Sequence, residues 1–204
     1  MGKKELNTLT LSKIKHAFNI NASLNIESIF NFLKKDKELS KLERMGSGMT
    51  SVVLKSSEDK VLILTIDLSK VIYMKKTNTA NFKFIKFIEY KDKVFILYEI
   101  DLLERIPEDK VVELEDEIFR LEDFSEIIYE DTIKDLSKDQ KREALDIIED
   151  MNIPIELDMN IIFDIAKKTF LDFYLDIHAG QFLFDPKKQK IVCIDPIASR
   201  NICI

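Results

Sequence analysis

Two aspartates near the end of the chain are the residues best placed to do chemistry. Asp176 and His178 lie two positions apart in a polar stretch, and Asp195 directly follows an apolar run at 191–194. A second apolar run at 182–184 and the turn between the two runs predict a hairpin. Such a hairpin would bring both carboxylates to one end. There, one acid could orient a hydroxyl group while the other holds a metal ion on a phosphate.

Length and composition limit the elements that must position these residues. The chain has 204 residues, 46% of them hydrophobic and 33% charged, which is typical of a globular protein with one two-lobed domain or two small domains. It contains only four Gly and four Pro, so we expect no long flexible linker. Cys193 lies in an apolar run and is expected to be a reduced core residue, because Cys193 and Cys203 lack metal-ligand spacing.

The sequence also bears on location. The first residues are polar and no apolar run reaches the length of a membrane span, so we expect no signal peptide and no contact with a membrane. The expected location is the cytoplasm.

Charge is distributed unevenly along the chain. The net charge is -6, but residues 104–158 contain 20 Asp and Glu against 7 Lys and Arg. This acidic block argues against binding of nucleic acid at that surface. It is interpreted first as the solvated face of helices, and alternatively as a surface that attracts a basic partner or mimics the charge of DNA.

The periodicity of apolar residues changes twice. Helical spacing at 11–18 and after a possible N-cap at Asn25 predicts two N-terminal helices. Short alternating runs then predict an antiparallel sheet, and helical spacing returns after Glu108, with Ser137 as a possible cap and Pro154 as a break. The expected strands cover 42–45, 51–54, 61–66, 82–89 and 94–100, with a turn at 46–48, and the expected helices cover 111–121, 138–149 and about 158–173.

These elements give an α+β fold in three parts. We expect an N-terminal helical extension at 1–40, a lobe built on the antiparallel sheet at 41–103, and a mainly helical lobe with the C-terminal hairpin at 104–204. The boundary between the two lobes is expected near 101–108.

The first motif lies between two expected strands. The residues from Gly46 to Val53 (GSGMTSVV) resemble the glycine-rich loop of protein kinases, in which small residues let backbone N–H groups approach the phosphates of ATP. The resemblance implies that Gly46, Ser47, Gly48, Ser51 and Val53 bind the nucleotide, with Val53 against the adenine. A single G-x-G is weak evidence, since such turns more often only join strands.

The second motif is more specific. Residues 176–185 (DIHAGQFLFD) resemble the catalytic loop of aminoglycoside-phosphotransferase-like kinases. Residues 194–198 (IDPIA) resemble the segment that replaces D-F-G in the small serine/threonine protein kinases of tailed phages. With the glycine motif upstream, the resemblance covers 42–198. It implies a protein-kinase-like fold with a reduced C-lobe, and ATP and Mg²⁺ as cofactors.

Roles carry over only at matching positions. Asp176 would orient the substrate hydroxyl and accept its proton, and Asp195 would bind Mg²⁺ on the phosphates. Gln181 stands where the family has a metal-binding Asn, and its extra methylene changes its reach. His178 would hold the loop through backbone hydrogen bonds.

The chain departs from the family at the cation that holds the phosphates. Kinases carry a Lys in the third strand, paired with a Glu on the next helix. The expected third strand at 61–66 contains no Lys, and residues 68–88 contain no Glu or Asp. Lys55 lies on the same face of its strand as Val53 and is the expected substitute, with Lys60 as a poorer candidate.

Four functions stay open on these grounds. The first is a phage-type serine/threonine kinase that modifies host proteins in the host cytoplasm. The second is a pseudokinase that binds and inhibits a host or defence protein. The third is a small-molecule phosphotransferase, and the fourth is an α+β domain that carries these motifs by chance.

Overall fold

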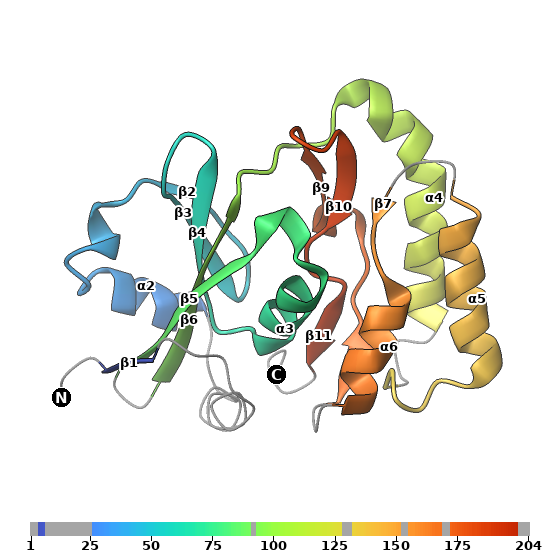
Figure 1. Ribbon diagram of the computed structural model, residues 1–204, viewed down its shortest axis with the longest axis horizontal. Helices are drawn as coiled ribbons and strands as arrows, with labels where there is room; N and C mark the ends of the chain where they lie inside the picture. The colour runs from blue at the N-terminus through green and yellow to red at the C-terminus, as the bar shows by residue number, and fades with distance from the viewer. Residues whose placement is uncertain are drawn as a thin grey trace. The chain divides into compact units, whose positions relative to one another are not determined.

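The computed structural model describes residues 4–6, 26–90, 93–127, 132–151, 155–168 and 172–199 (Figure 1). Helices and strands alternate in a mixed α+β architecture. The chain divides into two compact units, which are described separately. The first unit comprises Met1–Val71, Asn81–Leu102 and Asn201–Ile204, and the second comprises Ile72–Ala80 and Leu103–Arg200. The expected helix at 11–18 lies outside the described residues. So does Asn25, the expected N-cap of the second N-terminal helix.

A six-stranded antiparallel sheet forms the first unit, in the order β1-β5-β6-β4-β3-β2. The expected antiparallel sheet is therefore confirmed. Successive side chains of a strand point to opposite faces, so one face of such a sheet can pack on the core. The added strand β1 lies in the expected helical extension. The strands are β1 (Lys4–Leu6), β2 (Arg44–Ser47), β3 (Ser51–Lys55), β4 (Lys60–Thr65), β5 (Lys83–Tyr90) and β6 (Lys93–Asp101).

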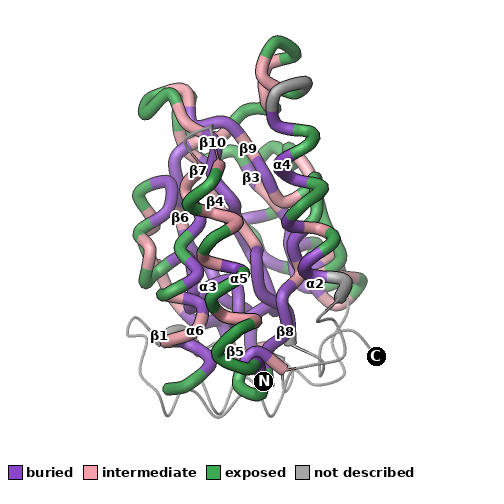
Figure 2. The backbone as a smooth tube through the Cα atoms, turned by 90° about the vertical axis from the view of Figure 1, so that its right-hand side faces the viewer, coloured by how far each residue is buried: buried purple, intermediate pink, exposed green. Residues whose placement is uncertain are grey.

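Helix α2 (Ile26–Leu33) covers one face of this sheet. Its buried residues Ile29, Phe32 and Leu33 recur at helical spacing and pack with alternate residues of β3, β4 and β6. The rings of Phe32 and Phe95 stack with centroids 4.8 Å apart. Figure 2 shows the backbone coloured by burial, with buried residues in purple. The helix is therefore part of the sheet's hydrophobic core.

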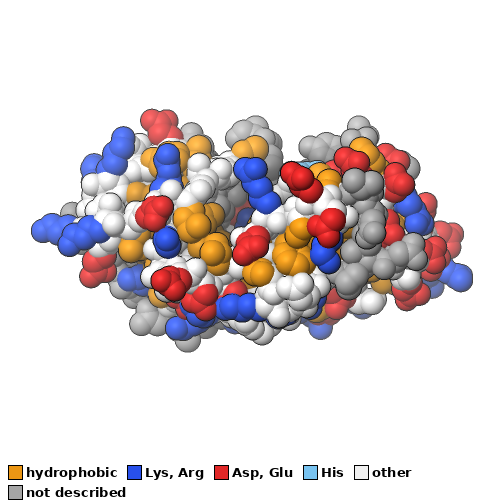
Figure 3. Space-filling view, turned by 90° about the horizontal axis from the view of Figure 1, so that it is seen from above, with side chains coloured by type: hydrophobic (Ala, Val, Ile, Leu, Met, Phe, Trp, Pro, Cys, Tyr) orange, Lys and Arg blue, Asp and Glu red, His pale blue; other side chains and the backbone are white. Residues whose placement is uncertain are grey.

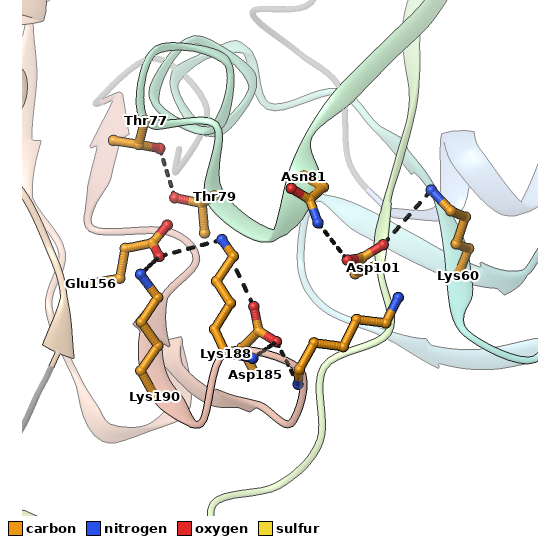
Figure 4. A network of polar contacts seen from close by, with 10 residues as sticks. Lys60, Thr77, Thr79, Asn81, Asp101, Glu156, Asp185, Lys188 and Lys190 are labelled. Carbon is orange, nitrogen blue, oxygen red and sulfur yellow. Dashed lines mark hydrogen bonds and ion pairs between the residues drawn. The ribbon is translucent and has the colours of Figure 1, made fainter.

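Helix α3 (Leu68–Thr77) follows β4, and the division between the two units falls within it. Its start is fixed by Asp67, whose Oδ1 accepts hydrogen bonds from the N–H groups of Ser69 (2.9 Å) and Lys70 (3.4 Å). At the far end of β4, Lys60 lies 3.7 Å from Asp101 Oδ1, and Asn81 donates to Asp101 Oδ2 (Figure 4). Helix α3 was not predicted from the sequence.

Three helices dominate the second unit: α4 (Glu108–Ile127), α5 (Lys138–Glu149) and α6 (Met159–Lys168). The expected cap at Ser137 is confirmed, because its hydroxyl accepts from the Gln140 N–H while the Gln140 side chain accepts from the Ser137 N–H. The helix expected over 158–173 is wrong at its end: α6 stops at Lys168, and Phe173 begins a strand. Pro154 lies outside the described residues.

Two small sheets complete the second unit. The expected hairpin is confirmed as β9 (Phe182–Asp185) paired with β10 (Lys190–Cys193), and β7 (Ile155–Glu156) runs parallel to β10. The buried Asp185 holds the hairpin turn, because its Oδ1 accepts hydrogen bonds from the backbone N–H groups of residues 187 and 188. Lys188 lies between Asp185 and Glu156 (Figure 4). Separately, β8 (Phe173–Leu175) pairs with β11 (Ile197–Ser199).

The side chain of Cys193 is fully buried and carries a free thiol, as expected. Of the helices in the described ranges, none has the length and apolar character needed to cross a membrane.

Candidate functional site

The pairing of β8 with β11 brings the two aspartates of the C-terminal motif to neighbouring backbone positions. Leu175 lies opposite Ile197, and the N–H of Asp176 donates to the carbonyl of Pro196 at 3.0 Å. Asp195 immediately precedes Pro196. The two acids were expected to meet at one end of the hairpin that is now β9 and β10; their backbone positions are instead brought together by the pairing of β8 with β11.

Asp176 is partly buried, and burial raises the pKa of its carboxyl group above the ordinary value, while the nearby charge of His178 lowers it to a smaller extent. Within the described residues, the Asp176 carboxylate has no hydrogen bond or ion pair. A carboxylate that is partly dehydrated and not engaged elsewhere is a better proton acceptor than a solvated one.

Helix α4 holds the backbone on both sides of Asp176. The buried hydroxyl of Ser125 donates to the carbonyl of Leu175 at 3.2 Å and accepts from the N–H of Ile177 at 3.4 Å. One side chain thus bridges the residue before Asp176 and the residue after it. Sequence reasoning missed Ser125, because a single serine in a helix carries no signal of a partner 50 residues away.

A second residue of α4 holds the next part of the loop. The carboxylate of Glu122 accepts a hydrogen bond from the N–H of Ala179. Glu122 and Ser125 are three residues apart and therefore lie on the same side of the helix. Together they anchor the segment from Leu175 to Ala179.

His178 caps the short 3₁₀ turn Ala179–Gln181. Its Nδ1 accepts from the N–H of Gly180 at 3.2 Å, so the proton of a neutral imidazole is on Nε2. Nε2 lies 3.0 Å from the side-chain amide nitrogen of Gln181, an arrangement that would set two N–H donors against each other. That amide must then present its oxygen to the imidazole, since an amide nitrogen accepts no hydrogen bond. His178 therefore holds the loop, as expected.

The same contact bears on the metal-binding role expected of Gln181. The amide oxygen that accepts from His178 is the atom that a metal ion would need. In the described part of the chain, no group of three or more His, Cys, Asp or Glu could hold a metal ion. Asp176 and Asp195 supply carboxylate oxygens, the ligand type that Mg²⁺ prefers, and Mg²⁺ is commonly held by one or two carboxylates together with substrate phosphates. The donor set therefore fits a metal ion that arrives with a phosphate ligand.

The glycine motif forms the hairpin between β2 and β3 in the first unit. The N–H of Gly48 donates to the carbonyl of Ser51 at 3.0 Å, and Gly46 lies opposite Val53. A Cβ atom added at Gly46 or Gly48 would have no neighbour within 4 Å, so this backbone is open to a ligand. The expected strand, turn and strand are therefore present. Met49, at the tip, is 75% exposed.

Val53 lies on the sheet face opposite the α2 core. Its neighbours Val52 and Leu54 belong to that core, whereas Val53 is partly exposed and pairs with Ile63 across the strands. This face continues toward the hairpin with Ser51 opposite Thr65. It thus changes from apolar to polar near the glycine loop.

A buried network of polar groups lies directly beneath the hairpin. Ser51 Oγ donates to Thr65 Oγ1 at 2.8 Å, and Thr65 Oγ1 donates to the carbonyl of Thr50 at 2.9 Å. The N–H of Asp67 donates to Thr65 Oγ1 at 2.9 Å, and the hydroxyl of Ser69 donates to Asp67 Oδ1. The network connects the glycine hairpin to the start of α3.

Lys70 adds a cation to this network. It is only 8% exposed, and its charge lowers the pKa of the Asp67 carboxyl group, although burial has the larger effect and raises that pKa overall. Residues 68–88 contain no acid, and Lys70 was not among the cations considered from the sequence. The sequence signal that could have found Lys70 is its position three residues after Asp67, in a segment for which neither a helix nor a strand was predicted.

Lys55 and Lys60 lie at the opposite end of their strands from the glycine hairpin. Lys55 is the last residue of β3, is exposed, and lies 3.7 Å from Glu43. Lys60 is the first residue of β4, so the third strand of the expected sheet does contain a lysine, but its partners are Glu99 (3.6 Å) and Asp101. These positions do not favour the phosphate-binding role expected of Lys55.

The acidic block maps to α4 and α5 with the residues around them. Figure 3 shows acidic side chains interspersed with Lys and Arg at the right-hand end, where these helices lie. Arg120 lies 3.9 Å from Asp150, and Arg142 lies 3.8 Å from Asp146. This mixture agrees better with a solvated helical face than with a uniform acidic surface.

Comparisons with models of known protein families, with curated proteins and with solved structures gave no match to this chain. The site is therefore interpreted from its own geometry.

Proposed function

We propose that this protein is an ATP- and Mg²⁺-dependent protein kinase of the phage serine/threonine type that modifies host proteins. The observation that carries the proposal is the backbone hydrogen bond from the N–H of Asp176 to the carbonyl of Pro196, which holds the segment after β8, with Asp176, beside the segment before β11, with Asp195. Phosphoryl transfer needs positioning and charge stabilisation more than covalent chemistry from the protein. Two carboxylates on a braced loop meet that need.

The proposed roles are assigned to residues within each unit separately. In the second unit, Asp176 orients the substrate hydroxyl and takes its proton; Asp195 would hold Mg²⁺, which would supply charge neutralisation at the phosphates. In the first unit, the open backbone of Gly46 and Gly48 contacts phosphate oxygens, and Val53 contacts the adenine.

The element order also supports the proposal. Two strands with the glycine hairpin are followed by a third strand, a helix, and two further strands. This is the order in which kinases present the glycine-rich loop, the lysine strand and the helix after it.

A second candidate, a pseudokinase that binds and inhibits a host or defence protein, is favoured by one specific observation. The β4 residue beside the glycine hairpin is Thr65, and its hydroxyl is bound within the protein. A chain without a cation at that point could keep the shape of a kinase and lose the reaction.

The test is incubation with labelled ATP and Mg²⁺ or Mn²⁺, with the protein alone and with host lysate. Asp176→Ala and Asp195→Ala serve as matched variants. Transfer of label that both variants lose is the expected result. If the wild-type protein transfers no label, the kinase proposal fails. A stable complex with a host protein that Asp195→Ala leaves unchanged would then favour the pseudokinase.

A further inference from the structure

Helix α4 carries a row of side chains that its buried face does not include. These residues recur every three or four positions, so they lie on one side of the helix: Glu108, Val111, Glu115, Phe119 and Glu122. We call this row the α4 stripe. The buried face of the helix lies beside it and consists mainly of four apolar residues, each at most 6% exposed: Leu114, Ile118, Leu121 and Phe124.

Two large apolar side chains of the α4 stripe are exposed. Phe119 is 56% exposed and Val111 is 38% exposed, and their eight-residue separation is about 12 Å along a helix. One exposed apolar side chain is ordinary on a protein surface. Among the described residues, however, large hydrophobic side chains are exposed only here and at Met45 and Met49 of the glycine hairpin. Such side chains are therefore concentrated in two places and not scattered.

Three glutamates separate these apolar side chains along the stripe. Glu108, Glu115 and Glu122 each lie one helical turn from an apolar member, and the stripe contains no Lys or Arg. Within the described residues, Glu108 and Glu115 form no hydrogen bond or ion pair. The α4 stripe is therefore both acidic and apolar, and two of its carboxylates are not engaged by the described part of the chain.

The two basic residues of α4 do not neutralise the stripe. Arg120 lies 3.9 Å from Asp150, and the ammonium group of Lys110 lies 5.3 Å from the centre of the Phe184 ring. Neither residue is spaced by three or four positions from a member of the stripe, so both lie on other sides of the helix.

One end of the α4 stripe reaches the loop that follows Asp176. Glu122 accepts a hydrogen bond from the N–H of Ala179, three residues after Asp176. Phe119 precedes Glu122 by three residues, which is about 4.5 Å along the helix. A chain segment bound along the stripe would therefore run up to the loop of the candidate site in the same unit.

The charge of the stripe discriminates between partners. Nucleic acids and anionic membrane surfaces carry negative charge, so the glutamates would repel them. A second copy of this chain would set one acidic stripe against another in a symmetric contact, which like charges disfavour. A basic segment with apolar residues complements both the carboxylates and the exposed apolar side chains.

We propose that the α4 stripe binds a segment of the protein substrate in which apolar residues alternate with Lys or Arg. The inference rests on the proposed function and names its substrate class: proteins whose phosphorylated hydroxyl lies close to such a basic and apolar segment. Phe119 contacts an apolar side chain of the segment, and Glu115 pairs with a basic one.

The first test measures binding of fluorescein-labelled peptides to the wild-type protein by fluorescence anisotropy. The probe peptide alternates Leu with Lys or Arg around one serine. In one control peptide Glu replaces each Lys and Arg, and in the other Ser replaces each Leu. We expect the probe peptide to bind most tightly, and added salt to weaken its binding because salt screens exposed charges. Equal binding of the three peptides, or no binding of the probe peptide, would overturn the inference.

The second test measures binding of the probe peptide to variants. Phe119→Ala should weaken binding about fivefold, and Glu115→Lys about tenfold. Glu143→Lys, an equal charge change at an exposed residue of α5, is the matched control and should bind within about twofold of wild type. A fluorescent ATP analogue with Mg²⁺ should bind all three variants as it binds wild type. Equal losses of peptide binding in Glu115→Lys and Glu143→Lys would show that only net charge matters, and the inference would be wrong.

The two proposals fail in different ways. A protein that binds the probe peptide through Phe119 and Glu115 but transfers no phosphate contradicts the kinase proposal and leaves the binding surface on α4 intact. A protein that phosphorylates the probe peptide with the same KM as wild type, Phe119→Ala and Glu115→Lys refutes the role of the α4 stripe alone.

Discussion

Asp67 in the first unit and Asp176 in the second are both aspartates whose pKa is raised by burial, yet their surroundings differ. Asp67 is 6% exposed, and its Oδ1 accepts from two backbone N–H groups and a hydroxyl. Asp176 is partly exposed, and its backbone is held by Pro196 and Ser125 while its carboxylate has no such bonds within the described residues.

The difference distinguishes an acid that stabilises the fold from an acid that is available for chemistry. A carboxylate oxygen that already accepts three hydrogen bonds from the protein, like Asp67 Oδ1, can cap a helix but has little capacity left for a ligand. An acid that is positioned through its main chain keeps its oxygens for a substrate or a metal ion. A raised pKa alone would not have distinguished the two residues, because burial is the leading cause in both.

The largest expected effect is on activity, from Asp176→Asn. Loss of the group that accepts the proton should reduce phosphate transfer by about 10²- to 10⁴-fold. Binding of the fluorescent ATP analogue should change little, because the variant keeps the shape of the side chain. Initial rates of labelled transfer and titrations of the analogue measure the two quantities. A variant with normal turnover would remove Asp176 from the proposed mechanism.

The pH dependence of Asp176 has opposite signs for activity and stability. Proton acceptance requires the ionised form, so the rate should fall as pH falls through the raised pKa. The free energy of unfolding should instead fall as pH rises above about 3.8, the ordinary value, because the unfolded chain releases its proton first. Asp176→Asn should therefore gain stability relative to wild type over this range. Urea unfolding at several pH values tests the sign, and a gap that narrows with rising pH would contradict it.

The next effect is on stability, from Asp67→Ala compared with Asp67→Asn. Alanine leaves the buried donors of the α3 cap without an acceptor, which should lower the free energy of unfolding by about 2 kcal/mol or more. Asparagine keeps a capping oxygen and should cost clearly less. Urea unfolding followed by circular dichroism gives both values. Equal losses would show that the charge of Asp67, and not its capping oxygen, is what the fold requires.

A smaller effect is expected from Ser125→Ala, with Ser137→Ala as its matched control. Each change removes one serine hydroxyl that satisfies a backbone N–H, so each should cost about 1 kcal/mol of stability. Only Ser125 holds the backbone around Asp176. We therefore expect Ser125→Ala alone to lower the rate of phosphate transfer, with the affinity for the ATP analogue unchanged, and Ser125→Thr to restore part of the rate. Equal rates in the two alanine variants would exclude a positioning role.

The smallest expected effect comes from Gly180→Ala. An added Cβ would lie 3.0 Å from His178 Cε1 and 3.1 Å from Nδ1, so the imidazole must shift by a few tenths of an ångström. The chain has only two histidines, and the His178 signal can be followed by NMR once the other is replaced. We expect a changed His178 resonance and a small loss of stability. Gly46→Ala, where a Cβ meets no atom, is the control for stability.

The sequence predicted the parts of the fold whose pattern is local. Strands β3 to β6 were found from short runs of apolar residues between turns, and the α5 cap from Ser137 directly before the helical run. Helix α3 was missed because Val71, Ile72, Tyr73 and Met74 are all buried, which removes the polar stripe that identifies an amphipathic helix. Strands β1, β8 and β11 have three residues each, too few to show a period.

For the candidate site, the sequence by itself determined which residue types stand in which order: the glycine hairpin, then Asp176, His178 and Gln181, then Asp195. Only the tertiary structure decided which of them have free oxygen atoms, because that depends on contacts between residues far apart in the chain. Ser125 and Glu122 hold the loop from 50 or more residues away, and the hydroxyl of Thr65 at the end of β4 is hydrogen-bonded to the loop of the glycine hairpin. Hydrogen bonds of this kind depend on distances of a few ångströms in space, which spacing along a sequence does not encode.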